Sequence, residues 1–176
     1  MINEQVILVD PQGKELGEKE KMQAHRDGDL HLAFSVLIYR QNAGQREYLM
    51  QQRALGKYHS GGLWTNSCCS HPRKGETMEQ AGIRRLQEEM GVVGINQLDD
   101  IASFLYRAEL DNHLVEHELD HILVHQVSEL VIDPNPEEVM SYRWWPSGDL
   151  MQSVEQSPEL FTAWFPQVLS ETEAHR

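Results

Sequence analysis

Two neighbouring cysteines and a histidine form a compact group of reactive side chains. The stretch "WTNSCCSHP", residues 64–72, contains Cys68, Cys69 and His71. Such thiols can form a disulfide, bind a metal, pack as small hydrophobic groups or transfer protons. Adjacent Cα atoms lie only about 3.8 Å apart, which is too close for an ordinary disulfide. A bond between the two cysteines is therefore not expected. In an extended segment, Cys69 and His71 point to the same side.

A second group of reactive side chains lies in "LVEHELDHI", residues 114–122. If this segment is a strand, Glu116, Glu118 and Asp120 project to one side, and His117 and His121 project to the other. Two carboxylates spaced in this way can share one cation. The alternative is an exposed strand with a polar face.

Histidines elsewhere in the chain extend the choice of metal ligands. The segment "MQAHRDGDLHLAF", residues 22–34, places His25 on a connecting segment and His31 near the start of an expected strand. A lone histidine is more often an ordinary core or surface residue than a ligand. If the fold brings His25, His31 and His71 to Glu116 and Glu118, however, the nitrogen and oxygen atoms suit Zn²⁺, Mn²⁺ or Mg²⁺.

The length and charge of the chain narrow the classes of function. The 176 residues carry 28 acidic and 15 basic side chains, a net charge of -13. This charge opposes binding to nucleic acid, so an anionic ligand needs a local basic cluster. We see no signal peptide and no apolar run of the ~20 residues that span a membrane. We expect a cytoplasmic, monomeric protein with a single domain over residues 1–176.

Alternating and helical patterns indicate a mixed α/β (α+β) fold. Strands are expected at residues 30–39, 47–53, 121–127 and 140–145, the first with one apolar face. The segment 75–91 predicts a helix, which begins with a capping box of Thr77 and Gln80 and ends at Gly91. The tail from Ser157 indicates a covering helix that is broken or kinked at Pro166. Residues 131–140 are predicted to form a turn-rich connection between apolar segments.

Charged residues on the expected helix resemble the end of the Nudix signature. The match is "RRLQEEMGV", residues 84–92, with Glu76 eight positions before Arg84. By itself, this pattern also fits a solvated helix face with paired charges. Arg85 stands where hydrolases of that superfamily have a glutamate that gathers Mg²⁺. The replacement argues against hydrolysis of a diphosphate and favours binding one.

Nearly the whole chain, from about Val6 to Phe165, resembles the type I isopentenyl-diphosphate Δ-isomerases of the Nudix superfamily. The matching pieces are "HRDGDLHLAFS", "QQRALGKYHSGGLWTNSCCSHP", the altered Nudix helix, "YRAELDNHLVEHELDH" and "FTAW", in the family's order. The resemblance implies a Nudix-like mixed β-sheet sandwich flanked by helices. It also implies interconversion of isopentenyl and dimethylallyl diphosphate by a 1,3-allylic proton shift.

The resemblance assigns roles to residues. It implies that Cys69 and Glu118 exchange protons with the substrate from opposite faces, with Tyr106 hydrogen-bonded to Glu118. We favour proton donation from the Glu118 side and acceptance by Cys69. Trp164 is expected to face the carbocation. The diphosphate contacts are Lys21, Arg53, Lys57 and Arg85, and the candidate metal ligands are His25, His31, His71, Glu116, Glu118, Glu89 and Cys69. One divalent metal (Mn²⁺, Zn²⁺ or Mg²⁺) would occupy the histidine–glutamate site, and Mg²⁺ on Glu89 would accompany the diphosphate.

Two other functions fit parts of the sequence. A Nudix hydrolase would use Glu76, Arg84, Glu88 and Glu89 to cleave a diphosphate. A non-catalytic metal-binding protein would use the histidines and carboxylates and would not need Cys69. The metal's identity and the direction of proton transfer stay open.

Overall fold

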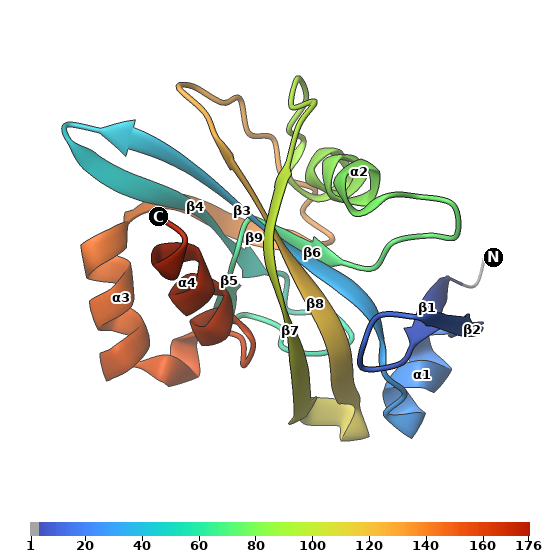
Figure 1. Cartoon of the computed structure of the whole chain (residues 1–176). Helices are drawn as coiled ribbons and strands as arrows, with labels where there is room; N and C mark the ends of the chain where they lie inside the picture. The colour runs from blue at the N-terminus through green and yellow to red at the C-terminus, as the bar shows by residue number, and fades with distance from the viewer. Residues whose placement is uncertain (1–3) are drawn as a thin grey trace.

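The computed structural model describes residues 4–176 as one mixed β-sheet with helices on its faces (Figure 1). The strands are β1 (Gln5–Val9), β2 (Glu15–Glu20), β3 (His31–Asn42), β4 (Gln45–Arg53), β5 (Trp64–Thr65), β6 (Cys68–Ser70), β7 (Asp99–Glu109), β8 (Val115–Gln126) and β9 (Val139–Pro146). The α-helices are α1 (Lys21–Asp27), α2 (Met78–Met90), α3 (Ser147–Gln156) and α4 (Phe165–Ala174), and short 3₁₀ turns lie at η1 (Asp111–His113) and η2 (Pro158–Leu160).

The long strand β3 organises the sheet. It pairs in parallel with β8 and antiparallel with β1, β4 and β6. Antiparallel partners extend the sheet further, with β7 beside β8 and β9 beside β4. A parallel neighbour in an otherwise antiparallel sheet makes the sheet mixed, as expected. The pairing brings β3, β6 and β8 together near the middle of the molecule.

Other elements cover both faces of β3, which explains why its sequence is almost continuously apolar. Val36 and Ile38 pack on one face with Leu86 of α2, and Leu37 packs on the other with Phe165 of α4. Figure 1 shows α2 on one side of the sheet and α3 and α4 on the other. Phe34, Val36 and Ile38 share one apolar face, as the period of two predicted, and helices cover the opposite face as well.

Helix α2 confirms the prediction for residues 77–90. The side chain of Thr77 accepts a hydrogen bond from the main-chain N–H of Gln80, and the Gln80 side chain accepts one from the N–H of Thr77. At the other end, Gly91 adopts a left-handed conformation with φ 63°. This conformation is natural for glycine and ends the helix. The capping pattern thus fixes both boundaries of α2.

Two local predictions need correction, and one long strand was missed. His25 lies on helix α1 and not on a connecting segment. Pro166 lies in the first turn of α4 and does not interrupt a helix, because the first helical turn has no intrahelical partner for the N–H that proline lacks. Strand β7 was not predicted at all. Within residues 4–176, none of the helices has the length and apolar character needed to cross a membrane.

Candidate active site

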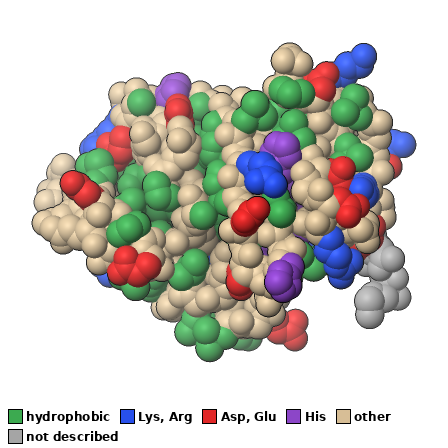
Figure 2. Space-filling view, turned by 90° about the horizontal axis from the view of Figure 1, so that it is seen from below, with side chains coloured by type: hydrophobic (Ala, Val, Ile, Leu, Met, Phe, Trp, Pro, Cys, Tyr) green, Lys and Arg blue, Asp and Glu red, His purple; other side chains and the backbone are tan. Residues whose placement is uncertain are grey.

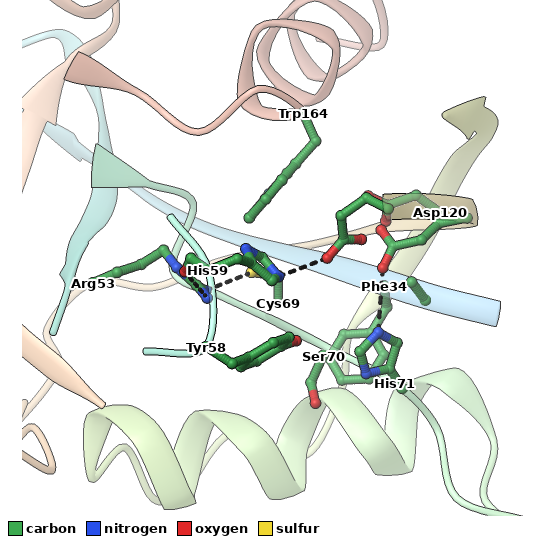
Figure 3. Close-up of a pocket in the computed structure, with 12 residues that line it drawn as sticks. Phe34, Arg53, Tyr58, His59, Cys69, Ser70, His71, Asp120 and Trp164 are labelled. Carbon is green, nitrogen blue, oxygen red and sulfur yellow. Dashed lines mark hydrogen bonds and ion pairs between the residues drawn. The ribbon is translucent and has the colours of Figure 1, made fainter. Parts of the chain in front are cut away.

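A small cavity opens where β3, β6 and β8 meet the segment before α4. Its walls include Cys69, Glu118 and Trp164, which come from three distant parts of the chain (Figure 3). The cavity has a volume of about 20 Å³, room for about one water molecule. The fold therefore places three of the predicted catalytic side chains around one cavity.

The carboxylates of β8 line this cavity. Glu116, Glu118 and Asp120 are all buried and lie on its walls, as the alternation of the strand predicted. The alternative of an exposed polar strand is excluded by their burial. The hydroxyl of Ser35 donates a hydrogen bond of 2.9 Å to Oδ2 of Asp120. Asp120 is thereby held beside the two glutamates, although the resemblance gave it no role.

Three imidazoles converge on the glutamates. The Nε2 atoms of His31 and His71 lie 3.5 Å and 3.2 Å from Oε2 of Glu118. The Nε2 atom of His25 lies 3.4 Å from Oε1 of Glu116. His31 begins β3, His71 follows β6 and His25 is in α1, so each ring comes from a different element. The structure brings together the five residues that the sequence proposed conditionally.

The orientation of the rings suits metal binding. Nδ1 of His25 contacts the carbonyl of Lys21 at 2.7 Å, and Nδ1 of His31 contacts that of Asp29 at 2.9 Å. A hydrogen bond from Nδ1 leaves Nε2 with a free electron pair. Both Nε2 atoms are buried and have no hydrogen-bond partner among residues 4–176. Buried acceptors beside carboxylates are the atoms that a divalent metal requires, so the donor set fits such an ion.

The potential ligands form two overlapping sets. In each set the ligand atoms lie within 4.8 Å of one another; the sets are His25, His31, His71 and Glu118, and His25, His59 and Glu116. His59 was not predicted as a ligand, because it lies in the loop after β4, where no periodic pattern marks a ligand. In the described part of the chain, Cys69 and Glu89 belong to no such set. Their metal-binding roles stay predictions.

Burial and close contact shift the proton affinities of the carboxyls. Burial opposes the charge of Glu116, but contacts with Glu118, His25 and His59 hold the Glu116 pKa well below its usual range. Burial and the charge of Glu116 raise the pKa of Glu118 well above its usual range. Burial likewise raises the pKa of Asp120 to about 8, although Ser35 opposes this. Without an ion, Glu118 therefore binds its proton more strongly than an ordinary glutamate does.

The two cysteines have different surroundings. Cys68 is fully buried in the cluster beneath α2, as predicted for a small hydrophobic group, whereas Cys69 lines the cavity. Both thiols are free. Burial raises the pKa of Cys69 to about 12, and the guanidinium of Arg53, whose Nη1 lies 3.9 Å from the sulfur, opposes this rise. The resting Cys69 is thus a neutral thiol beside a cation.

Aromatic side chains complete the walls of the cavity. The indole N–H of Trp164 donates a hydrogen bond of 3.2 Å to Asn66, which fixes the ring. Tyr106 lies opposite Glu118 in the β7–β8 pair, and its ring meets that of Trp164 edge-on at 6.5 Å. The Tyr106 hydroxyl has no hydrogen-bond partner in the described chain. The predicted Tyr106–Glu118 hydrogen bond is wrong for this structure, because the phenol ring packs towards Trp164.

The four basic residues surround the cavity unevenly. Only Arg53 lines it, and Lys21 lines a neighbouring cavity of about 450 Å³ that shares Ser70 and His71 as a wall. The ammonium groups of Lys21 and Lys57 lie 4.6 Å and 5.7 Å from the centre of the Tyr58 ring. The structure thus places two of the predicted diphosphate contacts, Lys21 and Lys57, around one tyrosine.

Carboxylates hold the basic residues in this structure. Lys21 pairs with Glu4 at 3.0 Å, and Glu138 pairs with both Lys57 at 3.3 Å and Arg85 at 2.6 Å. Figure 2 shows Lys and Arg side chains scattered over one face, with acidic side chains nearby, rather than gathered in a stripe. The paired cations near the cavity are therefore available only to an anion that competes with carboxylates.

Comparison with known proteins identifies the family. The NUDIX domain model matches residues 29–165. An isopentenyl-diphosphate Δ-isomerase of Photobacterium profundum is 70% identical over 169 residues, which cover 96% of this chain and 94% of the relative. An isopentenyl-diphosphate Δ-isomerase of Aliivibrio fischeri is 45% identical over 176 residues, 99% of this chain and 97% of that protein.

Solved structures agree on the fold. A crystal structure of a Deinococcus radiodurans protein has a TM-score of 0.68 at 15% identity and covers 98% of this chain and 100% of its own. The NUDIX domain of Shewanella oneidensis NrtR has a TM-score of 0.63 at 17% identity, with 82% and 86% covered. These likenesses concern the fold alone. With the family model and the curated relatives, they establish that the chain belongs to the Nudix family and, within it, to the isopentenyl-diphosphate Δ-isomerases.

Proposed function

We propose that this protein interconverts isopentenyl diphosphate and dimethylallyl diphosphate. The observation that carries the proposal is the cavity in which Cys69 and Glu118 both form walls beside Trp164. A 1,3-allylic shift adds a proton at one carbon and removes another proton two carbons away. Two proton-carrying groups around one cavity supply this chemistry. The relatives named isopentenyl-diphosphate Δ-isomerase support the choice of substrate.

Cys69 and Glu118 are the proposed proton-transfer groups. Burial raises the pKa of both, so each binds its proton more strongly than it would in water. One group must lose its proton to become the acceptor. Arg53, beside the sulfur, would stabilise a Cys69 thiolate by its charge. Because the reaction is reversible, each group serves as donor in one direction and as acceptor in the other.

Trp164 is the proposed partner of the positive charge that develops on the substrate. The face of an indole ring attracts a cation by about 2 kcal/mol or more where water is excluded. Trp164 is buried at 3% exposure and lines the cavity, and its hydrogen bond to Asn66 fixes the ring. Tyr106 packs edge-on against Trp164 and helps to hold the indole ring.

A divalent ion in the histidine–glutamate cluster would fix the carboxylate of Glu118 and lower its affinity for protons. The residues that would hold it are His25, His31, His71, Glu116 and Glu118. Mn²⁺, Zn²⁺ and Mg²⁺ all accept this mixture of nitrogen and oxygen ligands. The chain itself anchors the imidazoles through Nδ1 and keeps the carboxylates buried.

The proposed diphosphate contacts are Lys21, Arg53, Lys57 and Arg85. The substrate would replace Glu138 as the partner of Lys57 and Arg85. Glu89, whose buried Oε2 atom lies 3.2 Å from Nη2 of Arg85, would hold the Mg²⁺ that neutralises the diphosphate. We further propose that the protein acts as a monomer in the cytoplasm, where free thiols persist.

The test is incubation of the purified protein with isopentenyl diphosphate, Mg²⁺ and Mn²⁺ in D₂O. We expect dimethylallyl diphosphate that carries deuterium, detected by NMR. Release of phosphate or a monophosphate without an allylic product would instead indicate the Nudix hydrolase. Metal uptake with neither product would indicate a metal-binding protein without this activity.

A further inference from the structure

His59 is a buried imidazole in the site for which the proposed mechanism has no role. It lies in the loop between β4 and β5, is 1% exposed and lines the same cavity as Cys69 and Glu118. Figure 3 shows its ring between Arg53 and the carboxylates. A polar ring that is buried at this place must have a partner, and its contacts show which one.

The side chain of His59 meets Glu116. Its Nε2 atom lies 2.7 Å from Oε1 of Glu116, closer than the Nε2 atom of His25, which lies 3.4 Å from the same oxygen. The other oxygen of Glu116, Oε2, is buried and accepts no hydrogen bond from residues 4–176. The ring of His59 therefore lies directly against the carboxylate of Glu116, although its Nε2 atom is not aligned for a hydrogen bond with it. Metal-binding carboxylates are commonly oriented by a neighbour in this way.

The ring of His59 is itself fixed. Its Nδ1 atom lies 2.9 Å from the hydroxyl of Ser60, whose N–H donates a hydrogen bond of 3.0 Å to Asp111. The ring also meets the edge of Trp164, with 5.7 Å between centroids. The loop is thereby tied to the turn that precedes β8, and the imidazole cannot swing away from Glu116 without breaking these contacts.

The main chain of His59 reaches the substrate-binding side of the cavity. Its carbonyl accepts a hydrogen bond of 3.0 Å from Nη2 of Arg53. The other arm of that guanidinium, Nη1, faces Cys69. One residue thus contacts a metal-site carboxylate through its side chain and a proposed diphosphate contact through its backbone.

His59 lies outside the set that contains His31 and His71. Its ring centroid is 6.1 Å from that of His25, whereas the centroid of His31 is only 5.0 Å from that of His25. An ion bound among His25, His31 and His71 would therefore lie nearer to Glu116 than to His59. This placement favours a role for His59 in orienting the carboxylate and not in binding the ion.

We propose that His59 is a positioning residue whose ring lies against Oε1 of Glu116 and fixes the orientation of this carboxylate at the metal site. Its carbonyl fixes Arg53 at the same time, so the loop couples the metal site to the place where the diphosphate binds. The first part concerns metal binding alone, and only the coupling to Arg53 rests on the proposed function.

The experiment compares His59→Ala and His59→Gln with the unaltered chain. The glutamine amide can donate to Glu116 from about the position of Nε2, but it is a poor metal ligand. His121→Ala is the matched control, because His121 lies on the other face of β8 and pairs with Asp100. Mn²⁺ binding is followed by the electron paramagnetic resonance signal of the free ion, which gives both the dissociation constant and the number of bound ions. Circular dichroism checks the fold.

We expect His59→Ala to weaken Mn²⁺ binding about 10-fold to 100-fold without changing the number of bound ions. His59→Gln should recover much of the affinity, and His121→Ala should match the unaltered chain. An unchanged dissociation constant in His59→Ala would overturn the proposal. So would a lost ion, or a failure of glutamine to restore affinity in a folded protein, because either result would make His59 a ligand.

Activity separates this proposal from the proposed function. If the unaltered protein binds Mn²⁺ but makes no allylic product, the proposed function fails while the Mn²⁺ comparison still tests His59. If it is active, His59→Gln should restore kcat more fully than His59→Ala when both are saturated with Mn²⁺. Equal kcat values for the two variants at saturation would contradict the orienting role.

Discussion

His31 and Glu118 lie side by side on parallel strands, with Nε2 of the imidazole 3.5 Å from Oε2 of the carboxylate. Nearly half of the chain separates them in sequence. Only the pairing of β3 with β8 brings them together, so the metal site forms when this ladder forms. An ion bound to both residues would stabilise the pairing, because it binds the folded state alone.

Glu118 is expected to be needed both for activity and for metal affinity. Glu118→Gln keeps the shape of the side chain but removes its charge and its ability to exchange a proton. We expect activity to disappear and metal affinity to fall by about 10-fold or more, because an amide is a weaker ligand. Steady-state kinetics and Mn²⁺ titration measure the two effects. A variant with the full rate would show that another group exchanges the proton.

The adjacent cysteines allow a matched comparison. Cys69→Ala should abolish turnover while fold and metal content persist, because it removes a proposed proton carrier. Cys68→Ala should keep turnover but lower the free energy of unfolding by about 1 kcal/mol, because it leaves a small cavity beneath α2. Product formation and urea denaturation distinguish these outcomes. Turnover by Cys69→Ala would remove the thiol from the mechanism.

The adjacent arginines of α2 provide a second comparison. Arg85 pairs with Glu138 near Lys57, whereas Arg84 pairs with Glu76. Arg85→Met should raise KM and the inhibition constant of inorganic pyrophosphate about 10-fold to 100-fold, since hydrogen bonds to charged groups contribute about 1.5–3 kcal/mol. Arg84→Met should leave both constants unchanged. Equal effects from the two variants would argue against a contact between Arg85 and the diphosphate.

Glu76 gives a prediction about pH. Hydrogen bonds of 2.7 Å and 3.0 Å from Arg84 lower the pKa of Glu76 from its usual value of 4.5. A carboxyl with a lowered pKa stabilises the folded state above its unfolded pKa, and this contribution is lost as pH falls through the folded pKa. Glu76→Gln should therefore lower the free energy of unfolding by about 1 kcal/mol at pH 7, and by progressively less below about pH 4. Urea titrations at several pH values measure the difference; a constant difference would contradict the ion pair.

Local signals predicted local structure well. Thr77, Gln80 and Gly91 mark the ends of α2 correctly, because capping depends on residues within a few positions. The alternation of Glu116 with His117 and Glu118 predicted which side chains share a face of β8. Strand β7 was missed because it lies at an edge and mixes exposed with half-buried residues, so its pattern is weak.

The site itself depends on contacts that no local pattern encodes. His25, His31 and His71 were proposed as ligands only on the condition that the fold brings them together. The structure fulfils this condition. His59 carried no such signal, because a histidine in a loop is ordinary until β4 and β8 place it against Glu116. The unpartnered hydroxyl of Tyr106 shows the opposite case: strand register put it beside Glu118, but packing against Trp164 directs the ring elsewhere.

The size of the reaction space has a kinetic consequence. The cavity beside Cys69, Glu118 and Trp164 has room for about one water molecule, although it is partly open to solvent. We therefore expect side chains at its opening to move aside when a five-carbon chain enters. If that movement is slower than the proton transfers, a viscous solvent such as a sucrose solution will slow the enzyme.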